Sequence, residues 1–308
     1  MKYAHTACLG GGVIGASWTA LFLASGRSVS VYDPDTDVEY NVKSYIERAW
    51  PTLEALGLCD HGTPDAVSFA TTAANAVQGA GFVQENVPER LAIKHATFAE
   101  IEPQLAEDAI VASSASGLML SQMQGGWKNP ERFVLGHPFN PPHLIPLVEV
   151  LGNDKTSSGV VAEARAFYES VGKITIEVKK ERNGHVANRL QAALWREAIS
   201  LVNDGVASVE DVDKAVWAGP GLRWAAMGPT TLFHLGAGAG GLNAFCAHFA
   251  DTFHGWWDEL GHAQLNDETI KVLVDGIAEA HGAASQTDLS AKRDALIVAM
   301  QQATRTLR

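Results

Sequence analysis

A histidine and a glutamate near the middle of the chain have the residue types and spacing needed for proton transfer. His137 lies in a proline-rich segment, Gly136–His143, and Glu149 follows twelve residues after it, flanked by valines. A carboxylate among apolar residues is costly to bury without a partner, and His137 is the nearest candidate. Glu149 would accept a hydrogen bond from one ring nitrogen, leaving the other to take a hydroxyl proton. The pair predicts a general base, with a structural His–Glu pair as the alternative.

A second group of residues with chemical potential stands near the amino terminus. Gly10, Gly12 and Gly15 form a Gly-x-Gly-x-x-Gly pattern, with Val13 and Ile14 between the last two glycines. Such glycines let the backbone turn tightly and approach a pyrophosphate, whose charge rests on the amino terminus of the next helix. We expect this turn to bind a dinucleotide; the alternative is a glycine-rich turn that binds none.

Asp33 indicates which dinucleotide to expect. It ends a strand-like run, Val29–Tyr32, and stands 18 residues after Gly15, where an acid accepts hydrogen bonds from the adenine ribose hydroxyls. No Arg or Lys follows it in Pro34–Asp37, so a 2′-phosphate would meet only negative charge. The cofactor should therefore be NAD rather than NADP.

The elements that must position these residues alternate between strand and helix over the first 180 residues. Strand-like runs are 4–9, 29–32, 66–70, 81–84, 109–113, 133–136, 147–150 and 173–178, and helical patterns separate most of them. This alternation predicts an α/β fold, a Rossmann-type doubly wound parallel sheet covered on both faces. His137 then lies at the carboxyl edge of the sheet, where such folds bind ligands.

Beyond Lys180 the strand signal disappears and helical spacing takes over. Helical patterns run over 186–204, 209–217, 230–235, 242–260, 269–280 and 289–304. The change near Glu181 predicts an NAD-binding domain over 1–181 and an all-α domain over 182–308.

Composition excludes several classes of protein. Of 308 residues, 46% are hydrophobic and 19% charged, which is typical of a folded globular protein. The net charge of −12 disfavours nucleic acid and anionic membranes as partners. Cys8, Cys59 and Cys246 match neither a disulfide framework nor zinc spacing, so we expect a cytoplasmic protein without a metal site. We also expect no signal peptide and no membrane span, because no apolar run approaches about 20 residues.

Several motifs in register resemble the 3-hydroxyacyl-CoA dehydrogenase superfamily over nearly the whole chain. Besides the glycine turn, the matching segments are Ser113–Leu118, His137–Pro141 and Val186–Leu190, in the order and approximate spacing of the family. The resemblance implies that His137 is the general base and Glu149 its orienting partner.

The resemblance implies roles for further residues by position. Ser116 matches the serine that bonds the reacting oxygen, and Asn188 matches the asparagine that holds the substrate beside the nicotinamide. Glu89, Lys94 and Asn140, together with Ser116, match cofactor-contacting positions. The alternatives are a helix cap for Ser116, a polar residue inside a helix for Asn188, and a solvated helix face for Glu89 and Lys94.

The chain departs from the family pattern in three places. Asn183-Gly184-His185 replaces the usual Pro-Gly-Phe, which predicts a looser hinge between the domains. Residues 34–63 hold only Lys43 and Arg48 as Lys or Arg, whereas acyl-CoA members use this region to grip coenzyme A. A segment containing Arg223, residues 219–229, is absent from the acyl-CoA enzymes.

These departures resemble the branch that oxidises small free 3-hydroxy acids, carnitine dehydrogenase and gulonate 3-dehydrogenase (lambda-crystallin). Trp195–Ala198 and Leu201–Val206 favour the carnitine enzyme. Arg223 suits a free carboxylate, which a guanidinium grips with two hydrogen bonds; a structural ion pair is the alternative. Tryptophans of the second domain would form a cation–π cage for a quaternary ammonium, or else belong to the core or a dimer interface. They include Trp217, Trp224, Trp256 and Trp257.

The sequence therefore predicts an NAD-dependent dehydrogenase in which a hydride leaves C3 of a small 3-hydroxy acid while His137 accepts the hydroxyl proton. A short-chain 3-hydroxyacyl-CoA dehydrogenase is one alternative. A crystallin-like structural protein that keeps NAD affinity is another, although the set of Ser116, His137, Glu149 and Asn188 argues against it. The all-α half of such enzymes usually pairs two chains, and the aromatic stretch Phe233–Trp257 suits that role, so we expect a homodimer.

Overall fold

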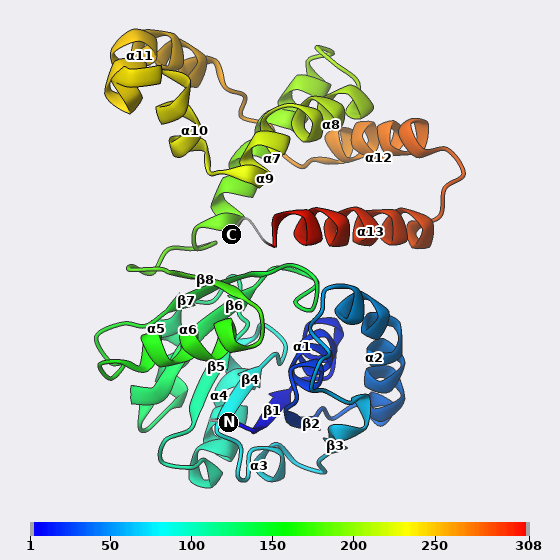
Figure 1. Ribbon diagram of the computed structural model, residues 1–308, viewed down its shortest axis with the longest axis vertical. Coiled ribbons are helices and arrows are strands. Elements are labelled where there is room, and N and C mark those ends of the chain that lie inside the picture. Colours follow the sequence, from blue (N-terminus) through cyan, green and yellow to red (C-terminus); the bar gives the residue numbers. More distant parts are fainter. Residues whose placement is uncertain (1–2, 306–308) are drawn as a thin grey trace. The chain divides into compact units, whose positions relative to one another are not determined.

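The computed structural model describes residues 3–305 of the chain (Figure 1). The chain divides into two compact units. The first runs to Val186 and resumes at Ser290, and the second is Ala187–Leu289.

The first unit is built on an eight-stranded sheet with the order β3-β2-β1-β4-β5-β6-β7-β8. The strands are β1 (His5–Leu9), β2 (Ser28–Tyr32), β3 (Val67–Phe69), β4 (Phe82–Glu85), β5 (Ile110–Ser113), β6 (Phe133–Pro138), β7 (Leu147–Leu151) and β8 (Ile174–Glu177). From β3 across to β6 every pairing is parallel. This confirms the expected Rossmann-type sheet in its main part.

The expectation of a wholly parallel sheet is wrong at β7. This strand pairs antiparallel with β6, and β8 then pairs parallel with β7. Residues 139–146 join β6 to β7, whereas a crossover between parallel strands needs about a dozen residues or more. The chain therefore turns straight back, and the register sets His137 directly opposite Glu149.

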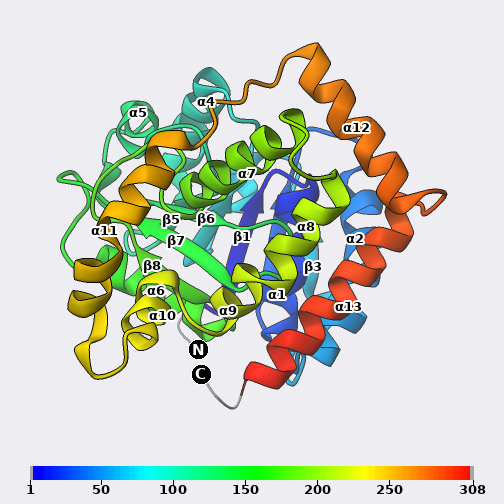
Figure 2. The same ribbon diagram turned by 90° about the horizontal axis from the view of Figure 1, so that it is seen from above.

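Helices cover both faces of the sheet, as Figures 1 and 2 show. They are α1 (Val13–Ala24), α2 (Val38–Ala55), α3 (Ala73–Ala76), α4 (Leu91–Ile101), α5 (Leu120–Met123) and α6 (Val160–Ser170). The last described helix, α13 (Gln286–Thr304), lies outside these two layers. Short 3-10 turns occur at Pro64–Ala66, Glu102–Gln104, Gln124–Gly126 and Pro130–Arg132. Neither α3 nor α5 was expected from the sequence.

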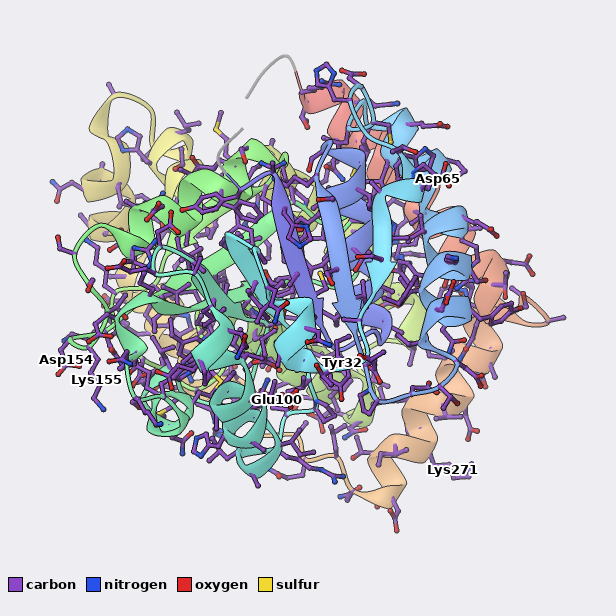
Figure 3. All side chains as sticks on the ribbon, turned by 90° about the horizontal axis from the view of Figure 1, so that it is seen from below. Tyr32, Asp65, Glu100, Asp154, Lys155 and Lys271 are labelled. Atoms are coloured by element: carbon purple, nitrogen blue, oxygen red, sulfur yellow. The ribbon has the colours of Figure 1, made fainter. Side chains whose placement is uncertain are left out.

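Successive strand residues point to opposite faces and so feed two separate cores. Cys8 packs with Trp18 and Phe22 on the face covered by α1, α2 and α6. Its neighbour Leu9 packs with Phe98 on the face covered by α3, α4 and α5. Figure 3 shows side chains on both sides of the central strands. The sheet is thus buried on both faces, as a doubly wound fold requires.

The last helix packs with the first unit, although the sequence analysis placed residues 182–308 in one domain. Most of α13 lies in the part of the chain that resumes at Ser290. Near its end, Gln302 donates to the carbonyl of Ala55 at 2.7 Å and Arg305 to that of Leu56 at 3.2 Å, both at the end of α2. Helical periodicity reveals an apolar face but not the surface that this face meets, so the sequence did not indicate this return.

The second unit is helical throughout its described elements, as expected. It consists of α7 (Ala187–Asn203), α8 (Val209–Ala218), α9 (Pro220–Ala226), α10 (Pro229–Gly236), a 3-10 turn at Gly238–Gly240, α11 (Gly241–Glu259) and α12 (Asp267–His281). Ser208 caps α8 by accepting from the amide of Asp211 at 3.1 Å. Within residues 3–305, no helix is long and apolar enough to cross a membrane.

Candidate active site

The hairpin of β6 and β7 brings His137 and Glu149 into contact. Nδ1 of His137 lies 2.9 Å from Oε2 of Glu149, and Oε1 of Glu149 accepts a hydrogen bond from the amide of Val186 at 2.9 Å. Glu149 is fully buried and His137 is 6% exposed. Because a carboxylate only accepts hydrogen bonds, Nδ1 carries a proton, and in the neutral imidazole Nε2 presents a lone pair.

A second histidine lies against the first. The ring centroids of His137 and His185 are 5.1 Å apart, and His185 is buried with its Nε2 3.4 Å from the carbonyl of Ala115. Burial, and then the proximity of His137, lower the pKa of His185 and favour its neutral form. The sequence analysis noted His185 only as part of a hinge; its signal was a histidine where the family has phenylalanine.

The loops that follow β4 and β5 are tied together by Glu89. Its carboxylate accepts hydrogen bonds from the amide of Ser116 at 2.8 Å, from the Ser116 hydroxyl at 3.1 Å and from the amide of Leu118 at 3.1 Å. Partial burial opposes ionisation of Glu89, but the hydrogen bonds from Gly117, Leu118 and Ser116 outweigh it and lower its pKa. Ser116 does not cap α5, whose N-cap is Met119.

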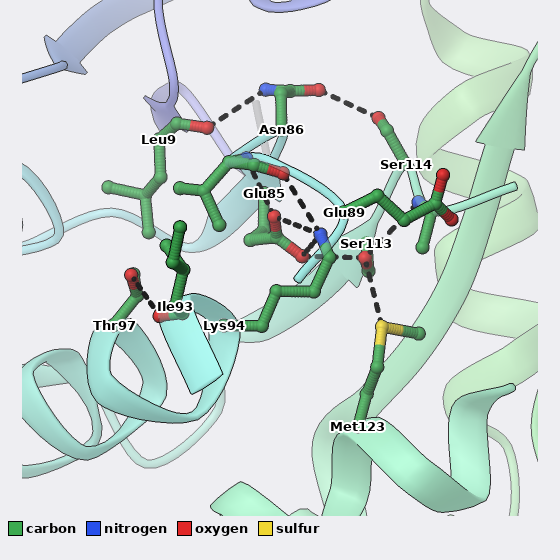
Figure 4. A network of polar contacts seen from close by, with 12 residues as sticks. Leu9, Glu85, Asn86, Glu89, Ile93, Lys94, Thr97, Ser113, Ser114 and Met123 are labelled. Atoms are coloured by element: carbon green, nitrogen blue, oxygen red, sulfur yellow. Dashed lines mark hydrogen bonds and ion pairs between the residues drawn. The ribbon is translucent and has the colours of Figure 1, made fainter. Parts of the chain in front are cut away.

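Lys94 lies in a buried ion pair and not on a solvated helix face (Figure 4). Its Nζ contacts both carboxylate oxygens of Glu85, at 2.6 and 2.8 Å, and the carbonyl of Val87 at 3.2 Å. These acceptors match the three ammonium hydrogens, which leaves none for the cofactor contact expected at Lys94. Glu85 also accepts from the hydroxyl of Ser113 at 2.6 Å. The sequence analysis missed Glu85, a carboxylate at the end of an apolar strand.

The glycine turn leaves space beside the amino terminus of α1. Gly10 has φ +90°, and a Cβ there would lie 2.6 Å from the carbonyl oxygen of Asn86. A Cβ on Gly15 would lie 1.8 Å from the carbonyl oxygen of Gly10, so both positions require glycine. A Cβ on Gly12 would meet no described atom within 4 Å, and no described side chain caps the helix that begins at Val13. The turn thus presents backbone amides to open space, which suits an anion.

Asp33 stands beside this turn, at the end of β2. Its Oδ2 accepts a hydrogen bond from the amide of Gly11 at 2.7 Å. A cavity of about 310 Å³ lies between the glycine turn, Asp33 and the facing side of α2. Its lining includes Val13, Tyr45 and Arg48. From the sequence, Arg48 was considered only in relation to coenzyme A and not as a neighbour of Asp33, although α2 brings it to the cavity.

Asn140 is exposed on the loop, residues 139–146, that joins the strands of His137 and Glu149. His143, in the same loop, is buried, and its Nδ1 lies 2.9 Å from the hydroxyl oxygen of Ser17. Burial, and next the charge of Lys173, lower the pKa of His143 to about 4. Burial lowers the pKa of Lys173 to about 7. The loop therefore contains one buried basic side chain, His143, and contacts a second, Lys173.

The remaining expected site residues belong to the second unit. Asn188 lies in the first turn of α7. Arg223 lies on α9, where it is exposed and forms no ion pair with a described residue. The four tryptophans named above are exposed as well, so they do not belong to a core within this chain. They are Trp217, Trp224, Trp256 and Trp257.

Both units match known protein families. Residues 5–182 match the family model of the NAD binding domain of 3-hydroxyacyl-CoA dehydrogenase, and residues 184–279 match the model of its C-terminal domain. The chain belongs to the 3-hydroxyacyl-CoA dehydrogenase family. It is an NAD-dependent dehydrogenase of this family.

Among its relatives are L-carnitine dehydrogenases. That of Streptomyces coelicolor is 43% identical over 300 residues, which cover 97% of this chain and 94% of the relative. That of Pseudomonas putida is 39% identical over 300 residues, with 97% and 94% covered. A solved structure with a TM-score of 0.83 and 31% identity covers 98% of both chains. It is 5-formyl-3-hydroxy-2-methylpyridine 4-carboxylic acid 5-dehydrogenase, an NAD⁺-dependent dismutase.

The residues of the first unit have the arrangement that NAD binding requires. The amides of Gly12, Val13 and Ile14 lie where the N-terminus of α1 faces open space, and Asp33 stands at the end of the neighbouring strand. A diphosphate suits the first position and a ribose the second. The glycine turn and Asp33 are therefore the residues that would hold the cofactor.

Proposed function

We propose that this protein oxidises the 3-hydroxyl of a small free 3-hydroxy acid of the carnitine type to the 3-keto acid, with NAD as the oxidant. The observation that carries the chemistry is the buried contact of 2.9 Å between His137 and Glu149. The carnitine-like substrate is supported by the L-carnitine dehydrogenases that are 39–43% identical over nearly the full length.

In this proposal His137 is the general base. Its Nε2 takes the proton of the substrate hydroxyl as the C3–H bond breaks, and NAD, when bound, accepts the hydride from C3. Glu149 holds the imidazole through Nδ1 and compensates the positive charge that His137 acquires. The amide of Val186 holds the second carboxylate oxygen, so the acid cannot turn away.

Ser116 bonds the reacting oxygen in this mechanism. Its hydroxyl donates to Glu89 in the structure, so a small rotation would redirect that hydrogen to the substrate oxygen. We assign cofactor contacts to Glu89, Ser116 and the exposed Asn140. Lys94 acts on the cofactor site only indirectly, because it holds Glu85 and the carbonyl of Val87, two residues before Glu89.

The second unit supplies the substrate-binding side chains in this proposal. Asn188 holds the substrate beside the nicotinamide, and Arg223 binds its carboxylate through a two-pronged contact, for which an exposed guanidinium with no ion pair to residues 3–305 is suited. The exposed tryptophans offer aromatic faces to a quaternary ammonium.

We further propose a cytoplasmic homodimer that pairs through the second unit. Large apolar side chains exposed on that unit, among them Leu235, Phe249 and Trp257, form a surface that a second copy would cover. The three cysteines are free thiols, which a reducing compartment preserves.

The experiment is an NAD-reduction screen over carnitine, gulonate, 3-hydroxybutyrate and 3-hydroxybutyryl-CoA, with His137→Ala as the blank. We expect the highest kcat/KM with carnitine and measurable turnover with other free acids. Efficient turnover of the CoA thioester without turnover of any free acid would show that the protein is a short-chain 3-hydroxyacyl-CoA dehydrogenase. Tight NAD binding without turnover of any acid would favour the crystallin-like alternative.

A further inference from the structure

The loop between β6 and β7 is held from outside by side chains of distant elements. The amide of His143 donates to the hydroxyl of Ser17 on α1 at 2.8 Å. Lys173, just before β8, donates to the carbonyls of Pro142 and Ile145, the latter at 2.7 Å. Gln301 on α13 donates to the carbonyl of Leu144 at 2.8 Å. Such partners are needed because this loop has no sheet or helix to satisfy its buried backbone.

Lys173 is an unusual residue for this task, because its ammonium is buried and forms no ion pair with any residue between 3 and 305. Its Nζ lies 5.0 Å from the centre of the Trp18 ring, so the protonated form has two loop carbonyls and an aromatic face as the partners of its charge. Burying a charge is costly unless such partners are fixed in place. The lysine and the loop therefore hold each other in one arrangement.

Gln301 brings the end of the chain to the same loop. It lies in the part of α13 that follows the second unit in sequence and belongs with the first unit. The next residue, Gln302, makes a bond of the same kind at 2.7 Å, but to Ala55 at the end of α2 and not to the loop. Gln301 therefore contacts the loop, whereas Gln302 contacts only the end of α2.

We propose that Lys173 and Gln301 are positioning residues of the active site. They hold the loop that carries Asn140 and joins the strand of His137 to the strand of Glu149. The inference rests on the proposed role of His137 as the base. A displacement of about 1 Å between reacting groups can lower a rate about 10²-fold. A more mobile loop would displace these groups and so lower kcat.

The test compares Gln301→Ala with its matched control Gln302→Ala. Both variants lose one hydrogen bond from α13 to a backbone carbonyl. We expect Gln301→Ala to lower kcat about tenfold with less than about a threefold change in KM for the hydroxy acid, since positioning acts mainly in the transition state. Gln302→Ala should keep both constants within about twofold. Amide hydrogen exchange in the peptide spanning 139–147 should accelerate only in the first variant.

Lys173 is tested in parallel. Lys173→Met should show the same drop in kcat and faster exchange in the loop, and Lys173→Arg should restore part of both, because a guanidinium can still donate to two carbonyls. If Lys173→Met does not fold, the comparison of Gln301→Ala with Gln302→Ala is sufficient to test the proposal. Equal kcat and equal loop exchange in Gln301→Ala and Gln302→Ala would overturn the proposal. The exchange measurement needs no substrate, so it remains decisive even if no free hydroxy acid is oxidised and the proposed function fails.

Discussion

At the scale of single residues, the partner of the buried carboxylate of Glu149 could be predicted from the sequence. Glu149 has no access to solvent, and its two oxygens are bonded to His137 and to the amide of Val186. The sequence analysis predicted this pair from the cost of burying an unpartnered charge, and that contact is present. It did not predict the neighbouring ring of His185, because a histidine in a turn gives no indication of which side chain it will meet.

At this scale, Asp33 is the residue that we propose to govern the choice of cofactor. We expect Asp33→Ala to weaken NAD binding, because the ribose hydroxyls lose their acceptor, and to narrow the preference for NAD over NADP. Arg48 remains in the same cavity and gains influence once the carboxylate is gone. Kd values for both cofactors test this, with Asp37→Ala at the start of α2 as the control. An unchanged NAD to NADP ratio in Asp33→Ala would contradict the assignment.

At the scale of elements, buried polar contacts fix the loops around the site. The Glu85–Lys94 pair ties β4 to α4, and Glu89 ties the loop after β4 to the loop after β5. None of this was visible in the sequence, because Lys94 has the spacing of an ordinary helix surface residue. Its side chain is only 1% exposed because it extends from α4 to the buried carboxylate of Glu85 at the end of β4.

Removal of one partner from the Glu85–Lys94 pair should be strongly destabilising. Lys94→Met leaves the Glu85 carboxylate buried without a counter-charge, which we expect to lower the free energy of unfolding by about 3–5 kcal/mol. Denaturant titration measures this. Adding Glu85→Gln to Lys94→Met removes the unpaired charge and should recover part of the loss. A Lys94→Met protein as stable as the parent would show that Glu85 does not depend on the ion pair.

His143 should make stability depend on pH below neutrality. Burial lowers its pKa to about 4 in the folded protein, against 6.5 when unfolded, so between these values the unfolded chain binds a proton that the folded chain does not. Stability is therefore present above about pH 6.5 and falls as pH decreases towards 4, by up to about 3 kcal/mol. The denaturation midpoint should depend less on pH across this range in His143→Gln than in the parent protein. A parallel fall in His143→Gln would assign the effect to other groups.

At the scale of the whole molecule, periodicity predicted nearly all helices and strands but not their partners. The alternation of strands and helices gave the doubly wound sheet, and the loss of strand patterns gave the helical region. The reversal at β7 was missed although the eight-residue connection 139–146 contained the signal. The return of α13 to the first unit left no signal, because an apolar helix face does not specify its partner.

Arg223 tests the substrate class of the whole enzyme. If it grips a free carboxylate, Arg223→Ala should raise KM for the preferred hydroxy acid at least about tenfold, the loss expected for a charge-assisted contact. Arg223→Lys should recover only part, because an ammonium cannot reproduce two parallel hydrogen bonds. Steady-state kinetics with the free acid and with its CoA thioester decide the matter. Thioester turnover that is efficient and unaffected by Arg223→Ala would place the protein with the acyl-CoA enzymes.

The central claim, that His137 held by Glu149 is the base, is tested most directly by single-turnover and steady-state NAD reduction with His137→Ala. The matched control is His95→Ala, which replaces a half-buried histidine on α4 whose Nε2 lies 2.9 Å from the carbonyl oxygen of Gln122. The account predicts that kcat falls about 10²–10⁴-fold in His137→Ala while Kd for NAD changes little, and that His95→Ala behaves as the parent. Near-normal turnover by His137→Ala would contradict the mechanism.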